Sequence, residues 1–450
     1  MAAGDLLDPD GRLRELAGDC VHCGFCLPAC PTYQLWGEEM DSPRGRIHLI
    51  TQILDGGEGS EATSEHFDRC LGCMACETAC PSGVQYGQLI EAARSWAEPV
   101  PGAQPAPPLP PRSLRERAVR AAIFGTFPYP ARLRAALGPL RAAQLTGLDR
   151  LAVRSKLLAR LLPEAAAALS VAPQPTGGPR SRHRPRLPAR IRARGERRAV
   201  VGMLTGCVQQ VLFPQVNVAT ARVLASEGCD VIVPHTQGCC GALSLHGGRR
   251  GEAAAFARKT IAAFEQAGVD TVVVNAAGCG SAMKEYEQLL AGDPAWAHRA
   301  TAFSAKVRDF SEFLAELGTV APRTELPLTI AYHDACHLGH AQRVTAQPRS
   351  LLRGIPGVRL TEVADGGTCC GSAGIYNLVQ PEAAAELGAR KAASVRATDA
   401  DLVVSGNPGC TLQIAQALTA TGQRMPVAHV AEVLDASIMG KPPGTLLTGG

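Results

Sequence analysis

The 450-residue chain contains few aromatic residues and no long apolar segment. Phe, Trp and Tyr together make up 4% of the sequence. No run approaches the ~18 consecutive apolar residues of a membrane-spanning helix. Residues 1–14 lack the apolar stretch of a secretory signal. We therefore expect a cytoplasmic protein whose membrane association is at most peripheral, on the inner face of the cell membrane.

The sequence also has little net charge and no nucleotide-binding fingerprint. The formal net charge of +4 is too small to predict nucleic acid as a partner of the whole protein. No predicted strand is followed by a G-x-G-x-x-G pattern that opens a helix. Because hydride transfer requires a flavin or nicotinamide cofactor, we expect the chain to pass electrons on and not to oxidise a substrate itself.

Cysteine, in contrast, is abundant, and eight of the 17 cysteines lie in two short runs. Both runs have the spacing C-x2-C-x2-C-x3-C-P, in which the fourth cysteine binds the other of two [4Fe-4S] clusters. The pattern predicts a first cluster bound by Cys20, Cys23, Cys26 and Cys80. It predicts a second cluster bound by Cys70, Cys73, Cys76 and Cys30.

Zinc and disulfides explain these cysteines less well. Structural zinc sites use C-x2-C pairs separated by a longer loop, whereas each run here places four cysteines within eleven residues. Disulfides belong to oxidising compartments. Seventeen cysteines in a chain of this length suit a reducing cytosol, where thiols stay free to bind metal.

Length and patterning divide the chain into several parts, since single cores stop growing near ~250–300 residues. We predict an α+β protein with an α-helical two-cluster ferredoxin-type domain, a middle of helices and linkers, and a duplicated C-terminal α/β cysteine-rich domain. The expected boundaries are 1–98 for the ferredoxin-type domain, 99–198 for the middle, and 199–320 and 321–450 for the two cysteine-rich repeats.

Two helices are predicted in the ferredoxin-type domain. Ser42 followed by Pro43 is a typical helix start, and apolar residues recur on one face as far as Leu54. A second helix is expected to end near Glu98. Both would cover the clusters, whose potentials depend on solvent exposure. The candidates for a dry shell around the clusters are Phe25, Leu27, Leu71 and Met74.

The middle segment combines linkers with amphipathic helices. Residues 99–111 are rich in proline and predict an extended linker. Residues 115–170 predict two or three helices, with a break at 128–130. Residues 173–198 contain nine arginines interrupted by prolines. We interpret this last stretch as a solvated, disordered linker, or as an arm that docks on an acidic partner or on anionic lipid headgroups.

From residue 199 the sequence alternates β-branched runs with helical patterns, which predicts parallel βα units. Strands are expected at 199–204, 230–233 and 271–274, with helices at 218–226 and 251–264. Three cysteine motifs then recur at offsets of 129, 130 and 131 residues. This repetition indicates a duplication, and we predict two similar halves facing each other about a pseudo-two-fold axis.

Each half places cysteines after its first three strands, where loops of parallel sheets converge. They are Cys207, Cys239, Cys240 and Cys279, and then Cys336, Cys369, Cys370 and Cys410. Such thiols can hold a soft metal or a further cluster, and the spacing leaves this open. The glycine after each Cys-Cys pair allows positive φ. Further candidate ligands or proton carriers are His235, His246, His333 and His337, although a single histidine more often has a structural role.

On these motifs the chain resembles the iron–sulfur subunits of glycolate oxidase. Related groups are the iron–sulfur subunits of anaerobic glycerol-3-phosphate dehydrogenase, lactate-utilisation complexes and heterodisulfide reductase. The most specific motifs are GCVQ at 206–209, GCCGA at 238–242 and CCGSAG at 369–374. The resemblance covers 19–87 and 200–434 and leaves the middle unmatched. The wider group ends each repeat with C-x2-C, whereas Ala282 and Gln413 replace the last cysteine here.

The resemblance implies two [4Fe-4S] clusters on the eight N-terminal cysteines. It also implies a subunit of an oxidoreductase complex, without a catalytic residue of its own. Electrons would come from a separate FAD-containing subunit that oxidises glycolate to glyoxylate, and would pass to a membrane or soluble acceptor such as a quinone.

Other functions remain open on the sequence alone. The chain could serve an equivalent complex for lactate, glycerol 3-phosphate or another 2-hydroxy acid. It could be a thiol or disulfide reductase that uses the Cys-Cys-Gly pockets, or a redox-sensing or scaffold protein.

Overall fold

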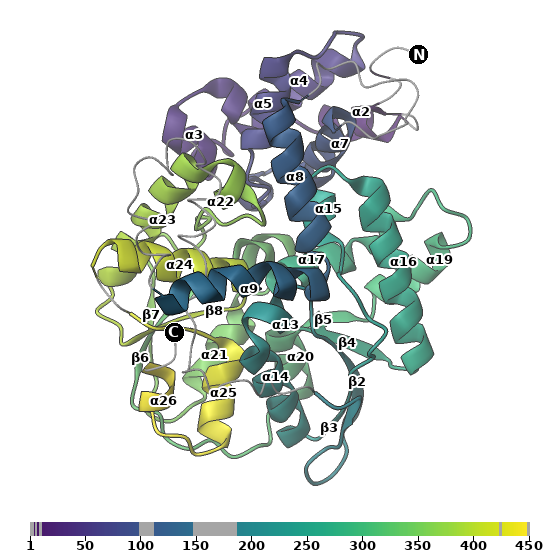
Figure 1. Ribbon diagram of the computed structural model, residues 1–450. Coiled ribbons are helices and arrows are strands. Elements are labelled where there is room, and N and C mark those ends of the chain that lie inside the picture. Colours follow the sequence, from purple (N-terminus) through teal and green to yellow (C-terminus); the bar gives the residue numbers. More distant parts are fainter. Residues whose placement is uncertain are drawn as a thin grey trace.

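The computed structural model describes residues 4, 7, 8, 11–98, 112–146, 187–422 and 425–447. Within these ranges the chain forms a helical N-terminal module and two α/β halves (Figure 1). The module lies at the top of the view, and the two sheets lie side by side below it. The mixture of helix and sheet agrees with the predicted α+β class.

The N-terminal module is built from short helices around the two cysteine runs. Ser42 caps one of them, because its Oγ accepts a hydrogen bond from the backbone N–H of Gly45 at 3.0 Å. Ile50 and Leu89 are fully buried in the module's core. The two predicted helices are confirmed, and the second ends at Ala97, with Glu98 as its C-cap. The helical elements are α2 (Arg12–Gly18), α3 (Pro31–Trp36), η1 (Glu39–Asp41), α4 (Pro43–Leu54), α5 (Glu61–Arg69), α6 (Ala75–Ala79) and α7 (Tyr86–Ala97).

Two helices of the middle segment follow, α8 (Leu114–Thr126) and α9 (Pro130–Thr146). They confirm the predicted helical pattern and its break at Pro128 to Pro130. Helix α8 joins the module to the first half, because Arg120 pairs with Glu98 at 2.8 Å and also donates to the backbone oxygen of Gly247 at 2.6 Å. The predicted linker at 99–111 and residues 147–186 lie outside the described part of the chain.

The first half contains a five-stranded sheet in the order β1-β3-β2-β4-β5. Its strands β2 to β5 are parallel, and the three predicted strands are confirmed. Helices α14 and α16 include the two predicted helices. The strands are β1 (Arg190–Ile191), β2 (Ala199–Leu204), β3 (Cys229–Ile232), β4 (Thr271–Val274) and β5 (Val307–Asp309). The helices are α13 (Gln209–Leu212), α14 (Pro214–Ser226), α15 (Ala242–His246), α16 (Arg250–Ala267), α17 (Ala277–Lys284), α18 (Tyr286–Leu289), α19 (Ala297–Ser304) and α20 (Phe310–Leu317).

Strand β1 corrects the expectation for the arginine-rich segment. Arg190 and Ile191 pair antiparallel with β3, and Arg190 Nη2 lies 2.6 Å from a carboxylate oxygen of Asp230. A disordered linker or free docking arm is therefore wrong for the C-terminal end of 173–198. The cause is that β3 offers an unpaired edge and a carboxylate that matches the arginine charge.

The second half contains a four-stranded parallel sheet in the order β7-β6-β8-β9, which repeats the order β3-β2-β4-β5. Its strands are β6 (Thr329–His333), β7 (Arg359–Glu362), β8 (Leu402–Ser405) and β9 (Val427–His429). The helices are the π-helix η2 (His337–Ala341), α21 (Ala346–Arg353), α22 (Tyr376–Val379), α23 (Pro381–Arg396), α24 (Pro408–Ala420), α25 (Val430–Ile438) and α26 (Gly444–Leu447).

The two halves share one hydrophobic core. Fully buried side chains of both sheets, among them Val201 and Ile330, belong to the same cluster. Helix α14 packs on α25, and Arg222 of α14 holds both carboxylate oxygens of Asp435 at 2.7 Å. No helix within the described ranges is long and apolar enough to cross a bilayer.

Candidate metal centre

The first cysteine run folds around a small cavity of about 30 Å³. Cys80, from the second run, lines this cavity together with Cys20, Cys23 and Cys26. The pKa of the Cys20 thiol is raised, mainly by burial and further by the charges of Cys80 and Cys23. Cys80 therefore lies beside the first three cysteines of the other run.

Cys30, the fourth cysteine of the first run, lies in the same way beside the second run. Burial raises the pKa of Cys76 well above its usual value, and the nearby thiols Cys73, Cys70 and Cys30 raise it further. Cys30 therefore lies near the three cysteines that begin the second run. Its Sγ is 3.2 Å from the hydroxyl of Thr32.

Both runs use the same backbone conformation. The residues in third position, His22 and Gly72, have φ of 53° and 62°. The residues in fifth position, Gly24 and Met74, have φ of 87° and 59°. Positive φ turns backbone N–H groups toward the inside of a loop, where they can donate to sulfur or to an anion. Gly72 does so, since its N–H is 3.3 Å from Cys70 Sγ.

The two groups of cysteines differ in exposure. Cys23 is exposed, and Cys20, Cys26 and Cys80 are half-buried, whereas Cys30, Cys70, Cys73 and Cys76 are buried. Leu71 and Met74 are buried beside the second group. Phe25 is 67% exposed, so its predicted place in a dry shell is wrong. The first group therefore lies at the surface and the second in the interior.

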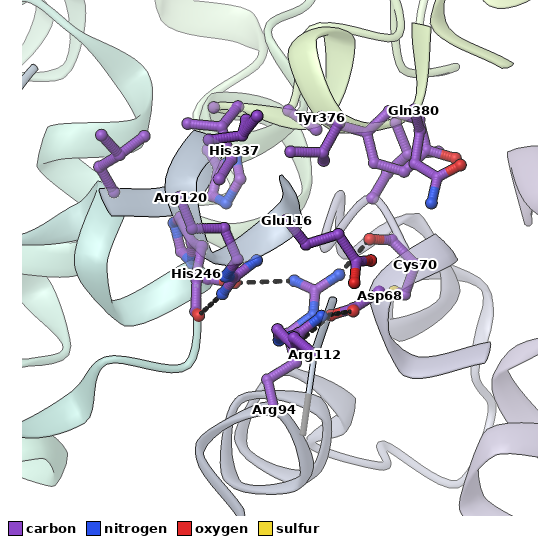
Figure 2. Close-up of a pocket in the computed structure, with 18 residues that line it drawn as sticks. Asp68, Cys70, Arg94, Arg112, Glu116, Arg120, His246, His337, Tyr376 and Gln380 are labelled. Atoms are coloured by element: carbon purple, nitrogen blue, oxygen red, sulfur yellow. Dashed lines mark hydrogen bonds and ion pairs between the residues drawn. The ribbon is translucent and has the colours of Figure 1, made fainter. Parts of the chain in front are cut away.

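Two buried arginines, which the sequence did not single out, lie beside Cys70 of the interior group. Arg46 is fully buried and is held by backbone and side-chain oxygens of Asp41. Arg94 donates to the backbone oxygen of Cys70 (Figure 2). It also donates to the backbone oxygen of Phe67. Burial alone would raise the pKa of Cys70, but the charges of Arg46 and Arg94 lower it below its usual value. The arginines thus favour the thiolate, which is the form that binds metal.

Thiols of each cysteine-rich half also converge, as predicted. In the first half Cys207 Sγ lies 3.4 Å from Cys239 Sγ. In the second half the ligand atoms of His333, Cys370 and Cys410 all lie within 4.8 Å of one another. The glycines after the Cys-Cys pairs, Gly241 and Gly371, have φ of 85° and 90°, as expected.

The four candidate histidines have different surroundings. His333 is buried, and neither of its ring nitrogens has a hydrogen-bond partner among the described residues. His337 Nδ1 lies 3.6 Å from Cys336 Sγ, and His246 Nδ1 lies 3.0 Å from a carboxylate oxygen of Glu91. His235 is exposed and lies outside these groups.

The second cysteine run meets the second half directly. Cys73 and Leu71 share a buried cluster with Cys336 and Cys369. The pKa of Cys73 is raised well above its usual value by burial and by the charge of Cys336. Helix α6 is fixed against η2, where Thr78 Oγ1 lies 2.9 Å from His340 Nδ1.

The spacing of the eight N-terminal cysteine thiols fits an iron–sulfur cluster better than single zinc ions. Thiolates around one tetrahedral zinc lie about 3.8 Å apart, given Zn–S bonds of about 2.3 Å. Among the described residues, only His333, Cys370 and Cys410 form a group of three or more ligands within 4.8 Å of one another. No three of the eight N-terminal thiols, all of which the structure describes, lie within 4.8 Å of one another, which suits a multi-atom centre.

Three family models match the chain. The "4Fe-4S dicluster domain" matches 17–84, and the "Cysteine-rich domain" matches 201–284 and 330–415. The model described as "Glycolate oxidase iron-sulfur subunit, linker region" matches 115–171. This last match corrects the expectation that the resemblance leaves the middle segment out.

Two relatives are similar over almost the whole length. The probable glycolate oxidase iron-sulfur subunit of Bacillus subtilis is 39% identical over 424 residues, which cover 92% of this chain and 93% of the relative. The glycolate oxidase iron-sulfur subunit of Escherichia coli is 37% identical over 437 residues, 96% of each chain. The chain belongs to the glycolate oxidase iron–sulfur subunit family. As a member of that family it is an iron–sulfur electron-transfer subunit of an oxidoreductase.

The share of the chain that each relative covers distinguishes the glycolate oxidase group from the lactate-utilisation group. Lactate utilization protein A of an Exiguobacterium species is 29% identical, and the match covers 53% of this chain and 98% of the relative. The glycolate oxidase subunits match the N-terminal module, the middle and both halves together. The full-length similarity thus favours the glycolate oxidase group over the lactate-utilisation group.

Proposed function

We propose that this chain carries electrons in a glycolate dehydrogenase complex. A separate FAD-containing subunit would oxidise glycolate to glyoxylate, and this chain would pass the electrons to an acceptor such as a quinone. The full-length similarity to glycolate oxidase iron-sulfur subunits carries the proposal. We also propose that the chain is a cytoplasmic subunit whose association with the inner face of the cell membrane is at most peripheral.

We infer two [4Fe-4S] clusters with exchanged ligands. Cys80 completes the first set and Cys30 completes the second, so the ligand sets are Cys20, Cys23, Cys26 and Cys80, and Cys70, Cys73, Cys76 and Cys30. The cavity lined by Cys80 and the first run supports the first set, and the charge of Cys30 near Cys76 supports the second. A [4Fe-4S] cluster takes up and releases one electron at a time.

We infer that electrons enter at the surface group of cysteines. Cys23 is exposed, and the apolar side chains of Val21 and Phe25 beside it are 69% and 67% exposed. Exposed apolar side chains around such a site are typical of a docking surface. The interior group, beside Cys336 and Cys369, would receive the electrons next.

We also retain the predicted domain division at 1–98, 99–198, 199–320 and 321–450, with a pseudo-two-fold axis relating the two halves. The matching strand orders and the shared core support this arrangement. Strand β1 indicates that the first repeat begins slightly before residue 199.

The test is an anaerobic reconstitution of the flavoprotein with and without this chain. We expect glycolate-driven reduction of an external dye to require the chain, and lactate and glycerol 3-phosphate to be poorer donors. About eight irons and eight labile sulfides per chain would match two clusters. A larger number would place metal on the repeat cysteines as well. Turnover that does not depend on this chain would overturn the proposal.

A further inference from the structure

The second cysteine-rich half brings two thiols and one imidazole into a compact group. His333 is the last residue of β6, Cys370 lies in the loop after β7, and Cys410 lies in α24, which follows β8 (Figure 1). Their ligand atoms, two Sγ atoms and one ring nitrogen, all lie within 4.8 Å of one another. Loops of a parallel sheet converge at the carboxyl ends of its strands. Three segments that are distant in the sequence therefore build one ligand set.

The His333 ring is buried and unsatisfied. The residue is 1% exposed, and neither ring nitrogen forms a hydrogen bond with a residue that the structure describes. One buried polar atom without a partner costs about 1–3 kcal/mol. A metal ion between the ring and the two thiols removes part of this cost, because one ring nitrogen becomes a ligand. Such an ion needs no cavity that water could enter, since it occupies the space between three neighbouring ligand atoms.

The spacing and the chemistry of the group suit a single zinc ion. With Zn–S bonds of about 2.3 Å and Zn–N bonds of about 2.0–2.1 Å, the ligands of a tetrahedral zinc lie about 3.5–3.8 Å apart. The separations here are at most 4.8 Å, so small shifts of the side chains would close the site. Thiolate and imidazole together are also the ligands that zinc prefers.

The two thiols share one proton. The pKa of Cys370 is lowered well below its usual value, first by the thiol of Cys369 and then by that of Cys410. The pKa of Cys410 is raised well above its usual value, chiefly by Cys370. Cys370 is therefore the thiolate, which is the form that binds metal. Coordination of Zn²⁺ by both sulfurs releases the proton of Cys410.

The first cysteine-rich half lacks the imidazole. His333 is paired with Ser405 in the second sheet, and Leu204 is paired with Val274 at the matching place in the first sheet. Each of the two residues precedes the first cysteine of its repeat by three positions. Leucine offers no ligand atom. The cysteines of the first half, all of which the structure describes, form no group of three ligands within 4.8 Å.

We propose that the second cysteine-rich half binds one structural Zn²⁺ ion through His333, Cys370 and Cys410, and that the first half does not. The buried thiols of Cys336 and Cys369 are the candidates for the fourth ligand of the tetrahedron. Because the ligands are buried, the ion is shielded from solvent and joins the end of β6 to the loop after β7 and to α24. This inference does not depend on the proposed function.

The first experiment measures the metal content of the full-length chain, purified anaerobically from cells supplied with zinc. We expect about one zinc per chain in addition to the iron of the N-terminal centres. X-ray absorption at the zinc edge should show sulfur neighbours at about 2.3 Å and one nitrogen at about 2.0–2.1 Å. Zinc with oxygen neighbours only, or no zinc after incubation with Zn²⁺, would overturn the site.

Two variants test the ligands. His333→Leu gives the second half the residue that the first half has at this place, and Cys410→Ser removes a sulfur. Competition with a chromophoric chelator should show that each lowers the zinc affinity by more than about 100-fold, since loss of an outer-shell partner alone costs about 10–100-fold. The iron content of the same samples shows whether the variants have folded. Zinc affinity equal to that of the wild type in both variants would overturn the proposal.

Cys279→Ser is the matched control. Cys279 is the third residue of α17, as Cys410 is the third residue of α24, so this variant should keep its zinc. Two zinc ions per chain, one of them lost in Cys279→Ser, would overturn the difference between the halves. More than about eight irons per chain, with the excess lost in Cys410→Ser, would place a cluster at the site and overturn the single ion.

Cobalt substitution tests the site without any variant. The unaltered chain is depleted of zinc with a chelator and titrated with Co²⁺. We expect the ligand-field and sulfur-to-cobalt absorption bands of a tetrahedral thiolate site, measured as the difference from the spectrum before addition, and their loss when Zn²⁺ is added. Cobalt that binds without sulfur-to-cobalt bands would contradict ligation by Cys370 and Cys410.

Discussion

The imidazole Nε2 of His429 lies 2.9 Å from the backbone oxygen of Asn275, so a side chain at the end of the second sheet is bonded to the first half. The other ring nitrogen accepts a hydrogen bond from the backbone N–H of Ala431 at 3.0 Å and caps α25. Nδ1 must therefore be free of a proton, and Nε2 must carry one. The two hydrogen bonds together require a neutral histidine.

This requirement predicts acid sensitivity of the folded chain. Burial lowers the pKa of His429 to about 4, from an unfolded value of about 6.5. The unfolded chain therefore binds more protons between these values, and stability falls as the pH drops from about 6.5 to about 4. From pH 7 to pH 5 the loss should be about 1–2 kcal/mol. Anaerobic thermal unfolding at the two pH values measures it.

His429→Asn is the control for that experiment. Asparagine can cap the helix but does not titrate. The variant should be less stable than the wild type at neutral pH, and it should lose less stability on acidification. Parallel curves for the two proteins would show that His429 does not cause the acid sensitivity.

The ion pair between Arg222 and Asp435 should stabilise the contact between the halves. Asp435 is 1% exposed and also pairs with Lys441 at 2.5 Å. Arg222→Ala leaves a buried carboxylate with one cation, and because Arg222 is partly exposed we expect a loss of about 1–2 kcal/mol. Chemical unfolding measures it. Arg390→Ala, which breaks an exposed pair with Glu386, should cost less than about 0.5 kcal/mol.

Arg94 should set the reduction potential of the interior centre. Its charge lies near Cys70, and a nearby positive charge favours the more negative, reduced state. Arg94→Gln should lower that potential by on the order of 100 mV, as measured by an EPR-monitored titration. Arg94→Lys keeps the charge and should shift it less. Equal shifts in both variants would mean that hydrogen-bond geometry, and not charge, is decisive.

The exchanged ligand sets predict an effect that crosses between the runs. Cys80→Ser should damage the centre held by Cys20, Cys23 and Cys26, because Cys80 lines that cavity. Cys30→Ser should damage the other centre. EPR and iron analysis of both variants resolve the two signals. If Cys80→Ser instead altered the signal that Cys30→Ser alters, the proposed exchange would be wrong.

The sequence predicted the features that contiguous residues encode. The cysteine runs, the cap at Ser42 and the strands at 199–204 and 271–274 depend on local spacing, and the structure has the helix and these strands at those places. The match of 115–171 to the glycolate oxidase linker was missed, because its Ala-, Leu- and Arg-rich pattern is common to many helices.

The features that long-range packing creates could not be predicted. Arg46 and Arg94 read as ordinary surface residues of amphipathic helices, but both are buried against cysteines. Tyr376 comes beside Leu71 and Cys73 only because the module docks on the second half. Phe25 was misplaced for the opposite reason, since an apolar residue between ligands can face solvent at a docking surface.

The position of Cys73 against Cys336 has a consequence for maturation of the protein. Cys73 is buried where the module joins the second half, in one cluster with Cys336 and Cys369. An assembly factor cannot reach this thiol once that junction has closed. We therefore expect iron and sulfide to reach Cys73 before the N-terminal module docks on the second half.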